Sequence, residues 1–442
     1  MSTAGATWQW PLSSAQRRIW ILHELDPKRL DHLVTISLEL NGTVEVDSLT
    51  KAWAEVFAHH SILRMRVSIE EGDPIAVVDV DSDVVMPYLD LVHIPPTVHE
   101  RLLNERLNKL RGEPMNLETG PITRTLLIRR EEHLYHLELI VHHIACDGWS
   151  VALLVDELLS AYLQIRKHKQ PERRKSSFYY ADYVRWEREV ESLRWDEMES
   201  RIIQRLLPLP EELHLPVEPR YWDEYQDGDE IILPINKDLT CELQRARIAS
   251  RETSLTLGLS ALGILLARLT GQDDMLVSVP LANRPAPEHE LIIGDFVNIG
   301  LVRINLHNTN NLQELIRRVS AETAYLLETQ SFPFDRLLTR LRSQGYPLDA
   351  LARRVAFTVQ NFPRTQKPPE DAGFSLLWHE PPERQSKFDL VFTLDEDPYM
   401  PSLIVTFRPS FFRKETIETW AKQYLAALSN LARVLNANTK EI

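Results

Sequence analysis

The 442-residue sequence predicts an α/β protein built from two lobes. Strand-like and helix-like segments alternate along the chain without an internal repeat, and each half contains both kinds. A chain of this length exceeds one ordinary core, so two or three domain-sized units are expected. Between the halves the composition becomes basic and hydrophilic, which predicts an interdomain linker around residues 166–178. The predicted lobes are therefore 1–170 and 171–442.

The first lobe alternates strands and helices. The predicted order is a strand at 33–40, a helix from Asp47 to about His60, a helix at 97–110, strands at 122–128 and 134–143, and a helix at 151–164. Asp47 is expected to cap its helix, because a carboxylate can accept hydrogen bonds from the free N–H groups at a helix start. The last of these helices is apolar on most faces, so we expect it to be buried.

The second lobe shows the same alternation. It is predicted to open with a long amphipathic helix through Tyr183 and Trp186. The later elements are helices near 239–249 and 255–269, strands at 275–280, 297–304, 355–360, 388–394 and 403–407, and a final helix at 417–435. Glycine is scarce, with 14 residues, and no Gly-rich phosphate loop is present. A nucleotide-binding enzyme is therefore disfavoured.

Composition limits the partners. Lys and Arg number 50 against 64 Asp and Glu, a net charge of −14, which disfavours nucleic acid. The two cysteines, Cys146 and Cys241, are too few for a disulfide framework or a structural zinc site. We find no secretion signal pattern at the N-terminus and no apolar run that could span a bilayer. These observations predict a cytoplasmic protein with no membrane partner and no structural metal; we also expect a monomer with no cofactor of its own.

The segment from His142 to Gly148, with the sequence HHIACDG, carries the strongest functional signal. It follows a strand pattern in which Tyr135, Leu137, Leu139, Val141 and His143 alternate with His136, Glu138, Ile140 and His142. His143 is thus expected at the end of the strand, facing the interior, before a turn closed by Asp147 and Gly148. An imidazole in this position can act as a base near neutral pH.

Simpler interpretations of this segment stay open. A histidine at a strand end is often a hydrogen-bonded core residue, and Asp-Gly is an ordinary turn. Cys146, beside the histidines, has the chemistry of a nucleophile, but we interpret it as a small buried thiol. The basic residues from Arg166 to Lys175, which include Arg173 and Arg174, are either a solvated linker or a docking surface for an acidic partner.

Six segments, in order along the whole chain, resemble motifs of the condensation domains of nonribosomal peptide synthetases. This family lies within the chloramphenicol-acetyltransferase-like superfamily of HHxxxDG acyltransferases. The HHxxxDG pattern is intact at His142–Gly148. The other matches are Leu12–Trp20 with SxAQxRxW, His60–Arg64 with RHExLR, Tyr180–Trp186 with YxDYxxW, Ile293–Asn298 with IGxFVN, and Phe332–Asp335 with YPFE. His59 and Ser61 depart from the RHExLR pattern. A late RDxSRxP element is poorly matched at Arg353–Ala356.

The resemblance implies a fold and a reaction. Two chloramphenicol-acetyltransferase-like lobes would form a V with a tunnel between them. Donor and acceptor peptidyl carrier proteins would insert 4′-phosphopantetheine arms, and the acceptor amine would attack the donor thioester to form an amide. His143 is the implied catalytic residue, supported by His142, Asp147 and Gly148. Asp147 would be structural and form a salt bridge with Arg284, an arginine from the other half of the chain. The backbone N–H of Gly148 is a candidate oxyanion donor.

Other functions within the resemblance stay open. Some relatives form esters from hydroxyl acceptors, epimerisation domains share the histidine motif, and some family members only recruit partner proteins. The intact His142–Gly148 motif favours catalysis, and the segment at 288–298 resembles condensing members more than epimerising ones. The sequence therefore predicts an acyltransferase of secondary metabolite biosynthesis, working with carrier proteins and with adjacent synthetase domains.

Overall fold

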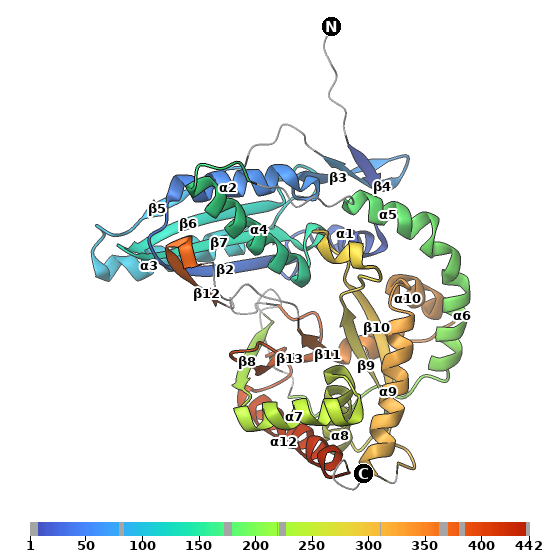
Figure 1. Ribbon diagram of the computed structural model, residues 1–442. Helices are drawn as coiled ribbons and strands as arrows, with labels where there is room; N and C mark the ends of the chain where they lie inside the picture. Colours follow the sequence, from blue (N-terminus) through green and yellow to red (C-terminus); the bar gives the residue numbers. More distant parts are fainter. Residues whose placement is uncertain are drawn as a thin grey trace. The chain divides into compact units, whose positions relative to one another are not determined.

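The computed structural model describes residues 8–78, 84–171, 179–218, 220, 227–309, 311–361, 370–379 and 385–438. Figure 1 shows the mixture of helices and sheets that the alternating pattern predicts. The chain forms two compact units. The first comprises Met1–Leu193, Arg284–Phe296 and Phe362–Pro381, and the second comprises Arg194–Asn283, Val297–Asn361 and Pro382–Ile442.

These units differ from the predicted division at residue 170. The first unit continues to Leu193 and takes in two segments from the second half of the sequence. The reason is non-local packing. Strand β12 (Phe374–His379) pairs with β2 (Leu33–Gly42), and Ile292, Ile293 and Phe296 are buried in the first unit's core. Residues 172–178 of the predicted linker, with Arg173, Arg174 and Lys175, lie outside the described residues.

The first unit contains two sheets. A five-stranded sheet has the order β12, β2, β7 (Leu134–His142), β6 (Thr123–Glu131) and β5 (Tyr88–Asp90). A three-stranded sheet has the order β1 (Gln9–Pro11), β4 (Asp73–Val78) and β3 (Met65–Glu70). The α-helices described in this unit are α1 (Ser14–Leu25), α2 (Val46–His59), α3 (Pro96–Gly112), α4 (Gly148–Arg166) and α5 (Tyr180–Glu189).

Strand β7 lies at the centre of the five-stranded sheet and is buried on both faces. Leu137, Leu139 and Val141 belong to the core shared with α2 and α4, as the alternation predicts. On the opposite face Glu138 is buried and forms an ion pair with Arg111 of α3. Because β7 is the central strand and is buried on both faces, its end fixes the position of the residues that follow it.

Two helix starts differ from the predictions. Helix α2 begins at Val46 after the cap position Glu45, so Asp47 lies in the first turn and not at the cap. Helix α4 begins at Gly148, three residues earlier than predicted, because the Asp147 side chain caps it by accepting a hydrogen bond from the Ser150 N–H. The Asp-Gly pair therefore starts a helix instead of closing a simple turn.

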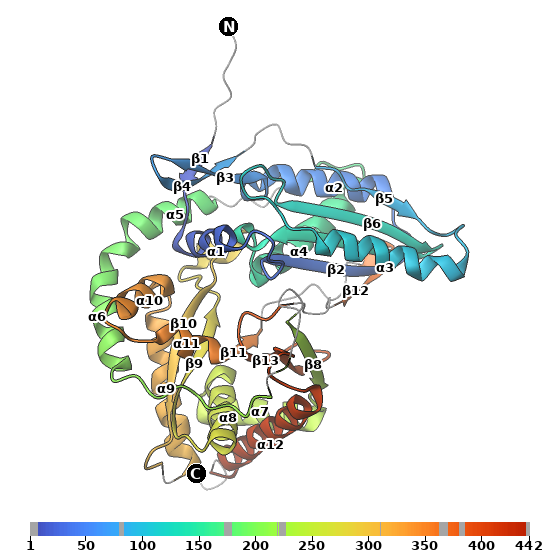
Figure 2. The ribbon, with the colours of Figure 1, turned by 180° about the vertical axis from the view of Figure 1, so that it is seen from behind.

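The second unit contains a six-stranded sheet, seen from behind in Figure 2. Its order is β10 (Asn298–Asn305), β9 (Asp274–Leu281), β11 (Val355–Gln360), β13 (Leu390–Asp395), β14 (Ser402–Phe407) and β8 (Asp229–Pro234). The α-helices described in this unit are α6 (Trp195–Leu206), α7 (Lys237–Ser250), α8 (Ser254–Thr270), α9 (Leu312–Glu328), α10 (Phe334–Ser343), α11 (Leu348–Arg354) and α12 (Lys414–Asn438). Apolar residues of α8 and α12 form its main core with the sheet.

The predicted long helix through Tyr183 and Trp186 is two helices. Helix α5 ends at Glu189, a short 3₁₀ helix follows at Glu191–Arg194, and α6 then begins at Trp195. The break coincides with the change from the first unit to the second at Leu193. Sequence periodicity continues across the break, because both helices are amphipathic.

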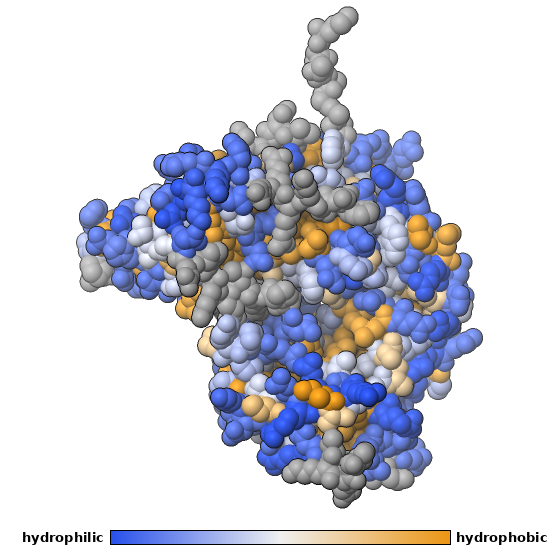
Figure 3. Space-filling view, in the orientation of Figure 1, coloured by the Kyte–Doolittle hydropathy of each residue, from blue (hydrophilic) through white to orange (hydrophobic). Residues whose placement is uncertain are grey.

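Hydrophilic side chains cover most of the face that Figure 3 shows, and hydrophobic residues there form small patches. Among the described helices, no single one is long and apolar enough to cross a membrane.

Candidate active site

The HHxxxDG segment begins at the last residue of β7. His142 closes the strand, and its backbone N–H donates to the Ile122 carbonyl at 2.9 Å. His143 starts a 3₁₀ turn at His143–Ala145 instead of extending the strand, and its N–H donates to the His32 carbonyl at 2.7 Å. The strand therefore ends one residue earlier than predicted, and His143 lies just past its end, with its Nδ1 in the interior. The turn leaves the His143 side chain 17% exposed.

His142 is a buried supporting residue. Its Nδ1 accepts a hydrogen bond from the Ile144 N–H at 3.2 Å, which places the ring proton on Nε2 whenever the imidazole is neutral. The rings of His23 and His32 pack against it, with centroid distances of 5.5 Å and 6.1 Å. Burial lowers the pKa of His23. Burial therefore favours the neutral form of His23 beside the motif turn.

Asp147 lies at the centre of a buried hydrogen-bond network. Arg284 Nη2 donates to its two oxygens at 2.9 and 3.0 Å, and the two side chains are 3% and 1% exposed. The Ser150 N–H donates to Oδ1 at 2.8 Å, and the Phe296 N–H donates to Oδ2 at 3.2 Å. Arg284 Nη1 in turn donates to the carbonyls of His289 and Ile292. Both oxygens of Asp147 are thus engaged.

The resemblance implied the Asp147–Arg284 pair and assigned the arginine to the other half of the chain. Arg284 comes from the second half of the sequence but belongs to the first unit. The pair therefore fastens the segment Arg284–Phe296 to the start of α4 within one unit. The arginine also lies over the Phe296 ring, 4.0 Å from its centroid.

The segment Gly294–Phe296 is held through its backbone at three consecutive residues. Ser150 Oγ accepts from the Gly294 N–H at 3.0 Å and donates to the Gly294 carbonyl at 2.9 Å. The Tyr180 hydroxyl donates to the Asp295 carbonyl, and Asp147 accepts from the Phe296 N–H. Gly294 is required here, because a Cβ at this position would lie 2.0 Å from an atom of the Tyr180 ring.

This clamped segment presents Asp295 to His143. Asp295 Oδ1 lies 3.4 Å from His143 Nδ1, and the Asp295 side chain is fully buried. His143 Nδ1 is itself buried. Sequence reasoning missed Asp295, because it occupies the variable position of the IGxFVN pattern. Its acidic character, in an otherwise apolar run, was the available signal.

Cys146 is buried beside this network. Burial raises the pKa of its thiol well above the ordinary value, and the neighbouring Asp147 raises it further. A thiol that stays protonated is a poor nucleophile. The geometry therefore agrees with the interpretation of Cys146 as a packing residue.

The first motif supports the same turn from α1. Gln16 is fully buried, and its Nε2 donates to the Ile144 carbonyl at 3.0 Å. Ser13 and Gln16 form the capping box that starts α1. The Ser13 hydroxyl also lies 2.8 Å from the Tyr180 hydroxyl. Motifs that are distant in sequence thus meet around the HHxxxDG turn.

Two further motifs brace this region. Tyr183 and Trp186 of the YxDYxxW match pack against His289, with centroid distances of 5.2 and 5.1 Å. His60 of the RHExLR match lies 2.6 Å from a Glu157 oxygen of α4. These contacts fix α4 and α5, from which Ser150 and Tyr180 reach the Gly294–Phe296 segment.

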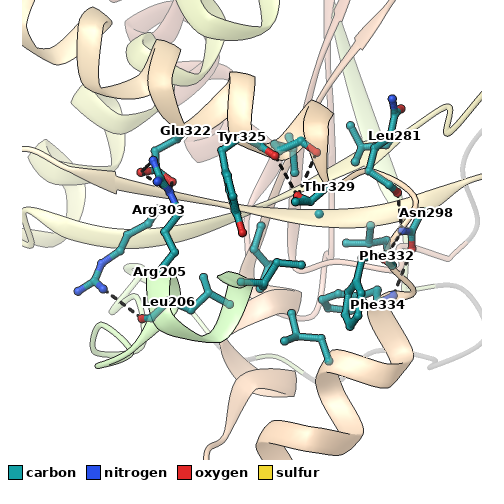
Figure 4. Close-up of a pocket in the computed structure, with 17 residues that line it drawn as sticks. Arg205, Leu206, Leu281, Asn298, Arg303, Glu322, Tyr325, Thr329, Phe332 and Phe334 are labelled. Carbon is teal, nitrogen blue, oxygen red and sulfur yellow. Dashed lines mark hydrogen bonds and ion pairs between the residues drawn. The ribbon is translucent and has the colours of Figure 1, made fainter. Parts of the chain in front are cut away.

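The remaining motif contacts lie in the second unit (Figure 4). Asn298 Nδ2 donates to the carbonyls of Gln330 and Phe332 at 2.8 and 2.6 Å, and its oxygen accepts from the Phe334 N–H at 3.3 Å. These residues border a cavity of about 40 Å³. Ligand pockets are usually several hundred Å³, so we interpret this cavity as a packing gap.

The fold and the motif network define a two-unit α/β protein organised around the HHxxxDG turn, and comparison with known families places it. The model of the condensation domain matches residues 8–442. The chain therefore belongs to the condensation-domain family, as its motifs predict.

A curated relative shows how much of a longer protein the chain represents. Chondramide synthase of Chondromyces crocatus is 28% identical over 415 residues, which is 92% of this chain and 10% of that protein. The chain thus spans about a tenth of the length of this relative.

Solved structures confirm the fold. The starter condensation domain of rhizomide synthetase is 17% identical with a TM-score of 0.82, over 96% of this chain and 95% of that one. The X-domain from teicoplanin biosynthesis, solved with OxyB, is 20% identical with a TM-score of 0.79, over 98% and 95% of the two chains. The V-shaped arrangement and the tunnel stay predictions.

The structure brings the five predicted site residues together. His142, His143, Asp147 and Gly148 lie in one turn, and Arg284 joins them through Asp147. Gly148 is the first residue of α4, where backbone N–H groups have no partner within the helix. The residue that sequence reasoning did not place here is Asp295.

Proposed function

We propose that the chain catalyses amide-bond formation between an acyl or peptidyl thioester on a donor carrier protein and an aminoacyl group on an acceptor carrier. The observation that carries this proposal is the partial exposure of the His143 side chain. His143 is the partly exposed histidine of a motif turn in which the side chains of His142 and Asp147 are buried and hydrogen-bonded. A rigid turn that leaves one imidazole accessible suits acid–base chemistry better than packing.

In the proposed reaction, the amine nitrogen of the acceptor attacks the thioester carbonyl carbon. His143 accepts a proton from the attacking nitrogen, or orients the amine for attack through a hydrogen bond. The buried position of Nδ1 leaves Nε2 as the nitrogen available to the substrate. The carbon–sulfur bond then breaks, and the donor phosphopantetheine departs as its thiol after taking up a proton.

Attack on a thioester places negative charge on the carbonyl oxygen. The N-terminus of α4 carries a partial positive charge that can stabilise it. The helix begins at Gly148, five residues after His143, and its free N–H groups point out of its N-terminus. We propose the Gly148 N–H as an oxyanion donor. Gly148 is exposed and has no side chain to obstruct a substrate.

The proposed partners follow from the same chemistry. Donor and acceptor would arrive on 4′-phosphopantetheine arms of carrier proteins, and the protein would need no cofactor of its own. The much greater length of the curated relative supports adjacent synthetase domains as further partners.

Two alternatives change one part of the proposal. An ester-forming member would keep His143 as the base and accept a hydroxyl group instead of an amine. A recruitment module would keep the fold without the chemistry, and the likeness to an X-domain solved with OxyB is the observation that favours it.

The test is a reaction between acyl-loaded donor and aminoacyl-loaded acceptor carriers, followed by the mass of the intact carriers. Wild-type protein should transfer the acyl group to the acceptor. His143→Ala should lower the rate by about 10²-fold or more, the usual contribution of an acid–base group. His133→Ala is the matched control, because His133 is an exposed histidine in the turn before β7 and should leave the rate unchanged.

The outcomes separate the three functions. Transfer to an aminoacyl acceptor supports the proposal, whereas transfer only to a hydroxyacyl acceptor supports the ester-forming alternative. If no acceptor is acylated while the protein still binds a partner protein, the recruitment alternative replaces the proposal.

A further inference from the structure

Two buried groups face each other beside the proposed catalytic nitrogen. Asp295 Oδ1 lies 3.4 Å from His143 Nδ1, and the carboxylate is fully buried. This separation is slightly longer than the 2.7–3.2 Å of an ordinary N–H···O hydrogen bond. Catalytic hydrogen bonds are often long in ligand-free structures and shorten when substrate binds. The pair is therefore positioned to form one hydrogen bond after a small rotation.

The position of Asp295 is imposed by the surrounding structure. Its neighbours Gly294 and Phe296 are hydrogen-bonded to Ser150 and Asp147, and its own carbonyl accepts from Tyr180. These bonds involve only the backbone of the Gly294–Phe296 segment. The position of the Asp295 side chain is thus set by the hydrogen-bonded backbone of its segment.

Asp147, the acidic residue of the HHxxxDG motif, cannot take the same role. Both of its oxygens accept hydrogen bonds from Arg284, and each accepts one more from a backbone N–H. It is also the cap of α4. Asp295 is the carboxylate for which the structure gives an ion-pair contact with His143.

We propose that Asp295 is a positioning residue for His143, and this inference rests on the proposed function. Its carboxylate accepts the Nδ1–H of His143, which keeps the lone pair of the neutral ring on Nε2, toward the substrate. When Nε2 takes the proton of the attacking amine, the imidazolium formed lies next to a buried negative charge. Asp147 of the motif and Ser150 of α4 would then act indirectly, because they hold the backbone that carries Asp295.

The first measurement is the tautomer of His143, from the ¹⁵N chemical shifts of its ring in protein labelled on histidine. Spectra of wild type and His143→Ala identify the signals. The wild-type ring should carry its neutral-state proton on Nδ1. Asp295→Asn, which keeps the size of the side chain, should shift the population toward the Nε2–H tautomer. This readout needs no substrate, so it holds or fails separately from the proposed function.

The second measurement is single-turnover amide formation. Asp295→Asn should reduce the rate constant by about 10²-fold, within the range lost when an acid–base group is compromised. The concentration of acceptor carrier at half-maximal rate should change little, and Asp295→Glu should recover part of the rate. The matched control is Asp395→Asn, a buried aspartate at the end of β13 in the second unit, which should leave rate and tautomer unchanged.

Combining the substitutions completes the test. In a His143→Ala background, Asp295→Asn should cause no further loss of rate, because its effect passes through the imidazole. An unchanged tautomer and an unchanged rate in Asp295→Asn would overturn the inference. If wild-type protein forms no amide but the tautomer depends on Asp295, the proposed function fails while the positioning contact stands.

Discussion

Two buried carboxylates beside the motif turn differ in the partners that they face. Asp147 accepts four hydrogen bonds, two from the buried guanidinium of Arg284 and two from backbone N–H groups. Asp295 is equally buried, but its contact with His143 is 3.4 Å long. Both oxygens of Asp147 are engaged by buried donors, whereas His143, the partner of Asp295, is still partly exposed to solvent.

This difference separates a residue that we expect to stabilise the fold, Asp147, from one that we expect to take part in the reaction, His143. A buried charge is tolerated when hydrogen bonds and an opposite charge replace its water shell, and Asp147 meets both conditions. A group that must change its proton in a reaction needs access to substrate, and the 17% exposure of the His143 side chain is compatible with the proposed role. We expect substitutions at Asp147 to act on folding and substitutions at His143 to act on rate.

The largest stability effect should come from breaking the Asp147–Arg284 pair. Asp147→Ala or Arg284→Ala leaves an unpaired buried charge, which commonly costs about 3–5 kcal/mol of unfolding free energy. The double variant should lose less than the sum of the two single losses, since both remove one interaction. Urea unfolding of the four proteins measures the coupling.

His143→Ala is the control for this cycle, because it should leave the unfolding free energy nearly unchanged. Additive losses at Asp147 and Arg284 would show that the pair does not act as a unit. Loss of activity in Asp147→Ala at unchanged stability and with the tautomer of His143 unaltered would make Asp147 a direct participant in the reaction.

The local sequence pattern predicted much of this region. The strand before His142, the alternation of its faces and the helix that follows are all present. Local patterns succeed here because β7 and α4 are long and regular. The Asp147–Arg284 contact, by contrast, followed only from family resemblance, since the two residues are 137 positions apart.

A smaller stability effect is expected from Ser150→Ala. The Ser150 hydroxyl bonds both the N–H and the carbonyl of Gly294, and it accepts from Arg284 at 3.0 Å. Its removal leaves these buried groups without one hydrogen-bond partner each, which should lower the unfolding free energy by about 1–3 kcal/mol. If Ser150 also aims Asp295, amide formation should slow in protein that is still folded.

Ser160→Ala provides the comparison for this variant, because Ser160 is an exposed serine on the same helix. It should change the unfolding free energy by less than about 0.5 kcal/mol. Equal losses in the two serine variants would contradict the role assigned to Ser150.

The smallest effect on catalysis is expected at Cys146. Burial raises the pKa of its thiol well above the ordinary value, so it should stay protonated and unreactive at pH 8. Iodoacetamide should then modify exposed Cys241 in the folded protein and both cysteines after unfolding. Cys146→Ala should keep most of the wild-type rate. Rapid labelling of Cys146 with loss of activity would restore it as a candidate nucleophile.

The features that sequence reasoning missed are non-local. The Arg284–Phe296 segment packs in the first unit although most of its sequence neighbours lie in the second. Strand β12 joins β2 across more than three hundred residues. Asp295 belongs to the same class, because a variable motif position gives no local sign that it faces a histidine. Such contacts depend on tertiary packing, which periodicity does not encode.

We propose that His143 is the reactive residue of a turn whose other contacts stabilise the fold. The most direct test is the single-turnover rate of amide formation by His143→Ala with both loaded carriers at saturating concentration, beside its melting temperature. We predict a rate lower by about 10²-fold or more at an unchanged melting temperature. A wild-type rate in folded His143→Ala would contradict the claim and remove His143 from the mechanism.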